Sequence, residues 1–311
     1  MSSAPVRRLT IATRESALAL AQAGHVRARL AALYPEAAVE LLGVTTQGDR
    51  VQDRSLAEIG GKGLFIKELE LALSDGRADL AVHSLKDVPM DMPEGFTLAA
   101  ISEREDPRDA FVSNRYLDLA GLPGGARIGT SSPRRQAQLR ERDPLLSIQM
   151  LRGNVNTRLA KLDQGQYDAI VIAAAGLRRL GLASRIASLL DPEDCLPAVG
   201  QGALALECRS DRPDVAAALR PLADRETTLA TTAERAFART LSGSCHTPIA
   251  AHAIFRHDEL WLRGLLASES GTDVMRGEKS ARVGDEQAAD ALGRALGAEF
   301  LARGADRLVA A

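Results

Sequence analysis

The feature that most constrains the fold of this chain is an alternation of short apolar runs with amphipathic segments over residues 7–101. RRLTIAT, VELLGVT and ADLAVHS have the length and apolar content of strands. Between them, residues 16–34 and 63–76 show helical periodicity, with Ser16 as a candidate N-cap and Gly76 as a terminator. A strand–helix–strand order needs crossover connections, which produce parallel strands covered by helices. We therefore expect a parallel α/β sheet here.

The alternation restarts after DPRDAFVS. Strands are predicted at RIGTSS, LSIQML and YDAIVIAA, with helices at residues 133–142 and 154–162 between them. The segment PAVGQGALALE has strand character and could return to the first sheet. The last ninety residues predict an amphipathic helix, a hairpin formed by IAAHAIF and LWLRGLLAS, and a final helix. We expect three domains, with the following limits: residues 1–102 with 201–222, residues 103–200, and residues 223–311.

Composition narrows the class of protein. Hydrophobic residues make up 45% and charged residues 26%, which is typical of a water-soluble globular protein, and 3% aromatic content predicts an aliphatic core. Three cysteines without a C-x-x-C pair indicate neither a disulfide framework nor a zinc knuckle, and they favour a reducing cytoplasm. Arg14 and Glu15 interrupt the first apolar run, and no stretch reaches the roughly 20 apolar residues of a membrane span. Export and membrane insertion are not expected.

Positive charge is concentrated in one segment. The net charge is −2, yet residues 127–179 hold ten Lys and Arg against four Asp and Glu. Of the 39 basic residues in the chain, 34 are Arg, an excess that genomic base composition or function could equally explain. Arginine binds carboxylates and phosphates through a planar, permanently charged fork. The segment therefore predicts a binding site for small anions.

Polar residues cluster where predicted strands end. Arg14 and Ser16 stand at a strand-to-helix junction, which is either a simple N-cap or an anion site. AVHSLKDVP places polar side chains, Asp87 among them, directly after an apolar strand, as either a polar loop or a ligand site. GTSSPRR combines hydroxyls with two arginines at a turn, and Arg152 and Arg158 repeat the pattern at the next turn. LSGSCHTPIA sets Cys245 in a small-residue turn, as a structural thiol or one open to modification.

Taken together, these motifs resemble the porphobilinogen deaminase (hydroxymethylbilane synthase) family. The resemblance runs in order over nearly the whole chain, through ATRESALALAQ, GGKGLFIKELE, AVHSLKDVP, GTSSPRRQAQL, LRGNVNTRL, AAAGLRRL, PAVGQGALALE and SGSCHTPIA. It implies an α/β protein of three domains, in which two domains like those of periplasmic binding proteins enclose a cleft and a smaller C-terminal α/β domain carries a cysteine. The residue after that cysteine is His246, where Gln is more usual in the family.

The resemblance also implies an activity. Members of the family are transferases of tetrapyrrole and heme biosynthesis that join four porphobilinogen molecules head to tail on a dipyrromethane primer, releasing ammonia and hydroxymethylbilane. By the match, Cys245 carries the primer through a thioether and Asp87 is the catalytic acid. The residues matched to substrate or cofactor binding are Arg14, Ser16, Gln22, Lys62, Phe65, His83, Ser84, Lys86, Thr130, Ser131, Ser132, Arg134, Arg135, Arg152, Gly153, Asn154, Arg158, Ala173, Arg179, Gln201 and Ser244.

The matched residues suit this chemistry. Each pyrrole carries an acetate and a propionate, so a primer with four added rings presents about a dozen carboxylates to bidentate arginines. The resemblance implies a cytoplasmic monomer that takes porphobilinogen as its small-molecule substrate, binds no metal, nucleic acid or membrane, and hands its product transiently to the next enzyme.

Two other readings of the residues stay open at this point. A non-catalytic receptor for small anions would share the two-domain cleft but would need neither Asp87 nor Cys245. A protein that binds single-stranded nucleic acid could use the arginine segment, but it would also be expected to offer aromatic stacking platforms. Residues 127–179 contain one aromatic residue, Tyr167.

Overall fold

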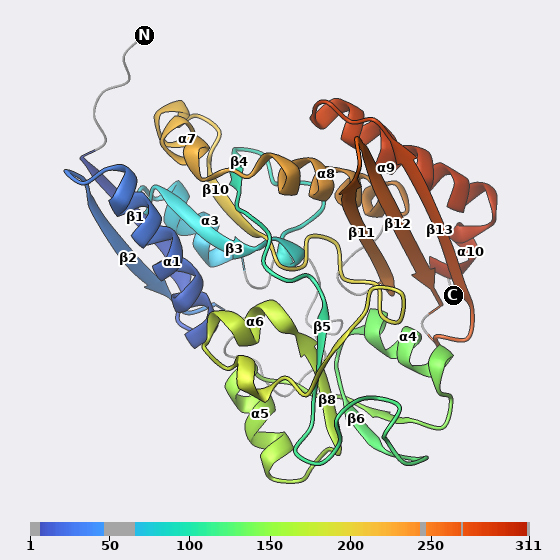
Figure 1. The fold of residues 1–311 in the computed structure, drawn as a ribbon. Helices are drawn as coiled ribbons and strands as arrows, with labels where there is room; N and C mark the ends of the chain where they lie inside the picture. Colours follow the sequence, from blue (N-terminus) through green and yellow to red (C-terminus); the bar gives the residue numbers. More distant parts are fainter. Residues whose placement is uncertain (1–6, 47–65, 243–246, 269, 310–311) are drawn as a thin grey trace. The chain divides into compact units, whose positions relative to one another are not determined.

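A computed structural model describes residues 7–46, 66–242, 247–268 and 270–309 of the chain (Figure 1). The chain divides into two units. The first consists of Met1–Arg104 with Ala203–Thr228, and the second of Glu105–Gly202 with Leu229–Ala311. The described residues of the two units form three sheets, two of five strands and one of three, so the fold is mixed α/β as expected.

The sheet of the first unit has the order β2-β1-β3-β10-β4. Its strands are β1 (Arg8–Arg14), β2 (Ala38–Val44), β3 (Leu80–Ser84), β4 (Phe96–Ile101) and β10 (Leu204–Arg209). β1, β2 and β3 are parallel, whereas β10 runs antiparallel to both β3 and β4. The return of the PAVGQGALALE segment to this sheet is confirmed. The parallel arrangement expected for the three predicted strands is confirmed in β1, β2 and β3, and the orientation of β10, which the sequence analysis did not predict, is antiparallel.

Helices cover both faces of this sheet. The helices are α1 (Ala17–Leu33), α3 (Lys67–Ser74) and α7 (Pro213–Leu219), with the short 3₁₀ turns η1 (Leu85–Asp87) and η3 (Arg220–Leu222). Alternate residues of β3 enter different cores: Leu80 and Val82 pack with Leu30 of α1, whereas Ala81 packs with Leu69 of α3. This division follows from the two-residue repeat of a strand.

The five-stranded sheet of the second unit has the order β7-β6-β8-β5-β9. Its elements are β5 (Asp109–Val112), β6 (Arg127–Gly129), α4 (Pro133–Arg142), β7 (Ser147–Gln149), α5 (Val155–Asp163), β8 (Ala169–Ala173), α6 (Ala174–Arg179), η2 (Ala183–Arg185) and β9 (Ser188–Leu190). β6, β7 and β8 are parallel, and β5 is antiparallel to β8 and β9. The predicted helix at residues 133–142 is confirmed, and the helix predicted from residue 154 begins one residue later, with Asn154 as its N-cap.

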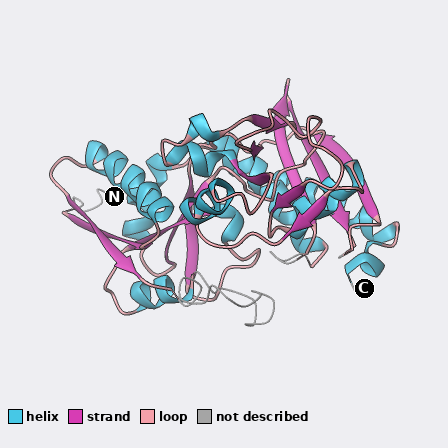
Figure 2. Ribbon diagram, turned by 90° about the horizontal axis from the view of Figure 1, so that it is seen from below, coloured by secondary structure: helices cyan, strands magenta, loops and turns pink. Residues whose placement is uncertain are grey.

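A three-stranded antiparallel sheet with helices forms the C-terminal part of the second unit (Figure 2). Its elements are α8 (Arg225–Thr240), which starts in the first unit, β11 (Ile249–Arg256), β12 (Glu259–Ala267), β13 (Val274–Ala281), α9 (Glu286–Ala302) and α10 (Ala305–Val309). The predicted hairpin is β11 with β12. Glycine is needed at Gly264, since a Cβ there would lie 2.5 Å from the ring of Phe237, which stacks edge-on against Phe300. Over the described ranges, no helix is long and apolar enough to cross a membrane.

Candidate functional site

The first unit gathers predicted site residues at the carboxyl edge of its sheet. β1 and β3 are parallel, so Arg14 and Ser84, their last residues, lie at the same edge. α1 begins there, and the Ser16 hydroxyl caps it by accepting a hydrogen bond from the N–H of Ala19. Buried Gln22, one turn further along α1, donates from Nε2 to the Ser84 hydroxyl at 2.9 Å. Of the two alternatives for Ser16, the role as an N-cap is confirmed. The anion site stays a prediction, and the N-terminus of α1 at this edge favours an anion.

Asp87 lies on a turn with a buried foundation. η1 follows β3 directly, and its Leu85 N–H donates to the Ala203 carbonyl at 3.0 Å, just before β10 begins. Leu85 and Val88 are buried in one cluster with Ile66. The carboxylate of Asp87 is exposed on this fixed turn. The packing of Leu85 and Val88 therefore fixes the position of the turn, and Asp87 on that turn is exposed to solvent.

His83 forms a buried pair that the sequence analysis did not anticipate. Its Nε2 lies 2.7 Å from Oε2 of Glu207 on the neighbouring strand β10, and both side chains are almost fully buried. Burial, then the charge of Glu207, raises the pKa of Glu70 on α3, partly offset by His83 and Lys67. One signal could have revealed Glu207: a carboxylate inside the apolar run LALEC needs a buried partner. One ring nitrogen of His83, which was predicted to bind substrate or cofactor, thus contacts Glu207.

In the second unit, too, parallel strands end at one edge of the sheet where helices begin, but this edge is rich in arginine. β6 and β8 are parallel, so Gly129 and Ala173 end at one edge, where the chain continues into α4 and α6. Ser132 and Asn154 cap α4 and α5 by accepting from the N–H groups of Arg135 and Thr157. Helix N-termini carry partial positive charge. Anions are therefore favoured at this edge even before its arginines are counted.

The turns at this edge are fixed by local contacts. Buried Thr130 accepts at Oγ1 from the N–H of Ser132, and the Ser131 hydroxyl donates to the Leu151 carbonyl at 2.6 Å. Gly153 has φ +109°, a backbone conformation open to glycine, and a Cβ there would lie 2.7 Å from Cβ of Thr157. The turns of GTSSPRR and RGNVNTR thus have a fixed shape that substitution would disturb.

Arg134 and Arg135 are buried and share one carboxylate. Nη2 of Arg134 lies 2.8 Å from Oδ2 of Asp109, and Nη2 of Arg135 lies 2.7 Å from Oδ1. Burial alone would raise the pKa of the Asp109 carboxyl, but the two guanidinium charges outweigh it and hold that pKa well below its usual value. Asp109 was not among the predicted site residues, although an acid opening the apolar run DAFV was a signal.

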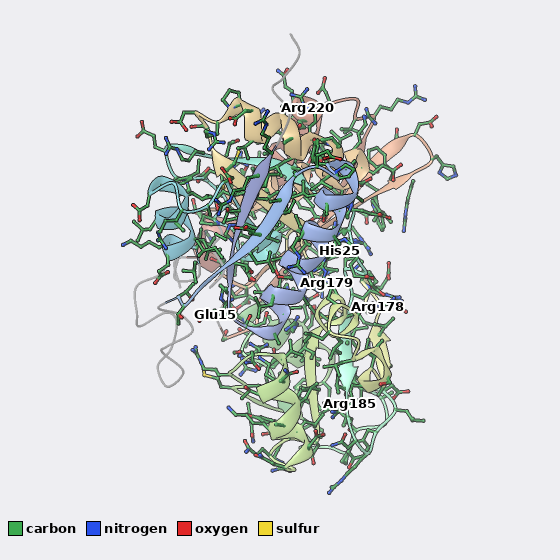
Figure 3. All side chains as sticks on the ribbon, turned by 90° about the vertical axis from the view of Figure 1, so that its left-hand side faces the viewer. Glu15, His25, Arg178, Arg179, Arg185 and Arg220 are labelled. Carbon is green, nitrogen blue, oxygen red and sulfur yellow. The ribbon has the colours of Figure 1, made fainter. Side chains whose placement is uncertain are left out.

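Four further predicted residues of this unit contact backbone carbonyls or side chains within the unit. Nε of Arg158 donates to the Gly153 carbonyl at 2.8 Å, and Nε of Arg152 contacts Sδ of Met150 at 3.3 Å. Arg179, beside Arg178 on α6 (Figure 3), donates to the Gly202 carbonyl at 2.5 Å, and burial lowers the pKa of Arg179. Buried Gln201 donates to Asp109.

Some predicted residues lie outside the described part of the chain. These are Lys62, Phe65, Ser244 and Cys245, together with His246. Lys86 lies half-buried on η1. Within the described ranges, no group of three or more His, Cys, Asp or Glu side chains is placed to hold a metal ion.

Comparison with known proteins covers nearly all of the chain. Residues 9–217 match the family model described as porphobilinogen deaminase, dipyromethane cofactor binding domain, and residues 228–302 match porphobilinogen deaminase, C-terminal domain. The chain is 59% identical over 307 residues to the porphobilinogen deaminase of Burkholderia thailandensis, covering 97% of this chain and 93% of that protein. It is 58% identical over 304 residues to that of Chromobacterium violaceum, covering 98% and 97%.

Solved structures give a more distant likeness. A putative methionine-binding lipoprotein from Bacillus subtilis superposes with a TM-score of 0.45 at 11% identity, covering 71% of this chain and 92% of that one. A nutrient binding protein from Burkholderia cenocepacia bound to methionine gives 0.44 at 12% identity, covering 71% and 93%.

Proposed function

The chain belongs to the porphobilinogen deaminase family, and from that premise we propose which of its residues carry the reaction. It is a transferase that joins four porphobilinogen molecules head to tail on a covalently bound dipyrromethane primer and releases ammonia and hydroxymethylbilane. The match of the chain to both family models is the observation that carries this conclusion. A non-catalytic anion receptor is not favoured, because it would match neither.

The described residues of the second unit suit a carboxylate-rich primer. Arg134 and Arg135 with Asp109 form a buried cluster of net charge +1, and Nε of each arginine is buried with no hydrogen-bond partner among the described residues. The primer, when bound, supplies the pyrrole carbon to which the first of the four units is joined. We assign its thioether anchor to Cys245 and its carboxylate contacts to Arg134, Arg135, Arg152 and Arg158, oriented by the capped turns of Ser132 and Asn154.

Proton transfer falls to Asp87. Loss of ammonia from porphobilinogen requires a proton at the leaving amine and then a negative group beside the cation that remains. A single carboxyl oxygen of Asp87 can give the proton and carry the resulting charge. Its exposed position on a buried turn supports this role, because the group can regain its proton from water between additions. Arg14, Ser16, Ser84 and Lys86 stand on or beside the same edge as further anion contacts.

Three domains would follow the limits 1–102 with 201–222, 103–200 and 223–311, which is supported by the presence of one sheet in each range. A cytoplasmic location is supported by the buried, free thiols of Cys195 and Cys208. We propose a monomer, since one chain contains the residues matched by both family models, and a transient handover of hydroxymethylbilane to the enzyme that consumes it.

The intact denatured mass of the purified protein tests the anchor. Wild type, Cys245→Ser and the control Cys208→Ala are each weighed before and after incubation with porphobilinogen. We expect the added mass of two linked pyrrole rings on wild type and the control, and none on Cys245→Ser. A wild-type chain that stays unmodified after incubation would contradict the proposed function, and a loaded Cys245→Ser chain would contradict the anchor alone.

A further inference from the structure

Asp109 organises the anion-binding edge of the second unit without belonging to the catalytic turn. It is fully buried at the start of β5, and because β5 runs antiparallel to β8 it pairs in register with Ala173, the last residue of β8. Besides the two arginines, its carboxylate accepts from Nε2 of Gln201 at 2.9 Å and from Sγ of Cys195 at 3.3 Å. One carboxylate thus receives four donors at the edge where α4 begins.

The charges in this cluster do not balance. Arg134 and Arg135 bring two positive charges and Asp109 one negative charge, while Gln201 is neutral. Burial raises the pKa of the Cys195 thiol to about 12, so Cys195 adds no charge. A buried charge without a counter-charge is strongly disfavoured. The cluster is therefore complementary to one additional carboxylate.

A nearby cluster of the same residue types has the opposite balance. Asp106 accepts from Arg108 at 2.8 Å and from Arg178 at 3.0 Å, so it too bridges two arginines. Glu105 and Asp191 also lie within 3.8 Å of these guanidiniums, which gives three carboxylates for two arginines. Both guanidiniums are more than one-third exposed. This cluster needs no further anion, and it provides an internal control for the Asp109 cluster.

We propose that Asp109 is a positioning residue that sets how tightly Arg134 and Arg135 hold the carboxylates of the growing chain, an inference that rests on the proposed function. The carboxylate of Asp109 accepts a hydrogen bond from Nη2 of each guanidinium group and cancels one of the two positive charges. Four rings must move past this edge and then leave, so each carboxylate has to be bound reversibly. Removal of Asp109 leaves two uncompensated guanidiniums that bind carboxylates more tightly and release the product more slowly.

Product release gives the first test. Wild type, Asp109→Asn and the control Asp106→Asn are each given four equivalents of porphobilinogen, and intact mass follows the species that carries six rings. We expect this species to persist about tenfold longer in Asp109→Asn, in line with one added charged hydrogen bond, and as long as wild type in Asp106→Asn. Equal lifetimes in all three proteins overturn the inference. A wild-type chain that adds no rings contradicts the proposed function instead.

A second test is independent of turnover and of the stability of Asp109→Asn. In the primer-free Cys245→Ser background, the citrate concentration that gives half of the maximal rise in Tm is measured for Arg135→Gln and for Arg135→Gln/Asp109→Asn. Arg135→Gln leaves a neutral cluster, and the double variant returns it to +1. We expect citrate to act at about tenfold lower concentration on the double variant. A double variant no more sensitive to citrate than Arg135→Gln shows that Asp109 is a purely structural partner.

Discussion

The two five-stranded sheets share a topology but treat charge at their carboxyl edges in opposite ways. Each has three parallel strands next to an antiparallel one, with helices starting where the parallel strands end. The first edge exposes the acid Asp87 and buries the His83–Glu207 pair behind it. The second buries Asp109 with Arg134 and Arg135. An exposed acid can exchange its proton with water, whereas buried arginines keep a fixed charge, so the same architecture suits the proton transfer proposed at one edge and the anion binding proposed at the other.

The largest effect is expected at the exposed acid. Asp87→Asn keeps the size of the side chain but cannot deliver a proton, so kcat should fall on the order of 100-fold or more. Because the side chain is exposed and the turn is held by Leu85 and Val88, Tm should stay at the wild-type value. Steady-state rates and thermal unfolding of Asp87→Asn are compared with those of Asp91→Asn, an exposed acid four residues on. Wild-type turnover in Asp87→Asn would remove Asp87 from the mechanism.

A smaller effect separates buried from exposed arginines. Arg134→Leu removes buried hydrogen bonds to Asp109 and to the Leu196 carbonyl and should lower the free energy of unfolding by about 1–3 kcal/mol. Arg178→Leu breaks a comparable contact with Asp106, but its side chain is 40% exposed, so the loss should be about 0–1 kcal/mol. Guanidinium chloride unfolding of both variants measures the difference. If both variants lost the same free energy of unfolding, burial would not distinguish the Asp109 cluster from the Asp106 cluster.

The smallest effect concerns the sign of pH dependence in each unit. The pKa of Glu70 in the first unit is raised, so its favourable contribution is present below the unfolded value of 4.5 and is lost as the pH rises through the folded pKa. Glu70→Gln should therefore be more stable than wild type at neutral pH, by a few tenths of a kcal/mol because the group is half-exposed, and no more stable at acid pH.

Asp109 is expected to show the opposite sign. Its folded pKa is lowered, so its contribution is present above the unfolded value of 3.8 and is lost as the pH falls through the folded pKa. Asp109→Asn should accordingly be less stable than wild type at neutral pH, and the gap should narrow in acid. Urea unfolding across the pH range measures both variants. A Glu70→Gln protein less stable than wild type at neutral pH would contradict the assignment for the first unit.

Local features of the fold could be predicted from the sequence, and long-range pairings could not. The cap at Ser16, the limits of α4 and the start of α5 to within one residue depend on residues close in sequence, so periodicity and capping chemistry locate them. Asp109 and Glu207 were missed because their partners lie 25 and 124 residues away. The direction of β10 was missed for the same reason, and the strands β4, β9 and β13 lack a strong alternating pattern of their own.

The site shows the same division. Strand ends, helix starts and arginine density already indicated anion binding at both edges. The roles proposed for Cys245 and Asp87 came from the family resemblance, because a single cysteine or aspartate in a turn has no periodicity or spacing that reveals its chemistry. The ion pairs of Arg134 and Arg135 with Asp109 could not be predicted, because they depend on the pairing of β5 with β8.

The position of β10 has a consequence for how the protein is made. β10 lies between β3 and β4, yet it is translated about a hundred residues after them. While the chain emerges from the ribosome, β4 has no neighbour to pair with, and the first sheet stays incomplete until residues 204–209 have left the exit tunnel. Residues 105–202, in contrast, contain all five strands of their sheet in one continuous stretch. The middle of the chain can therefore fold during synthesis before its N-terminal sheet is closed.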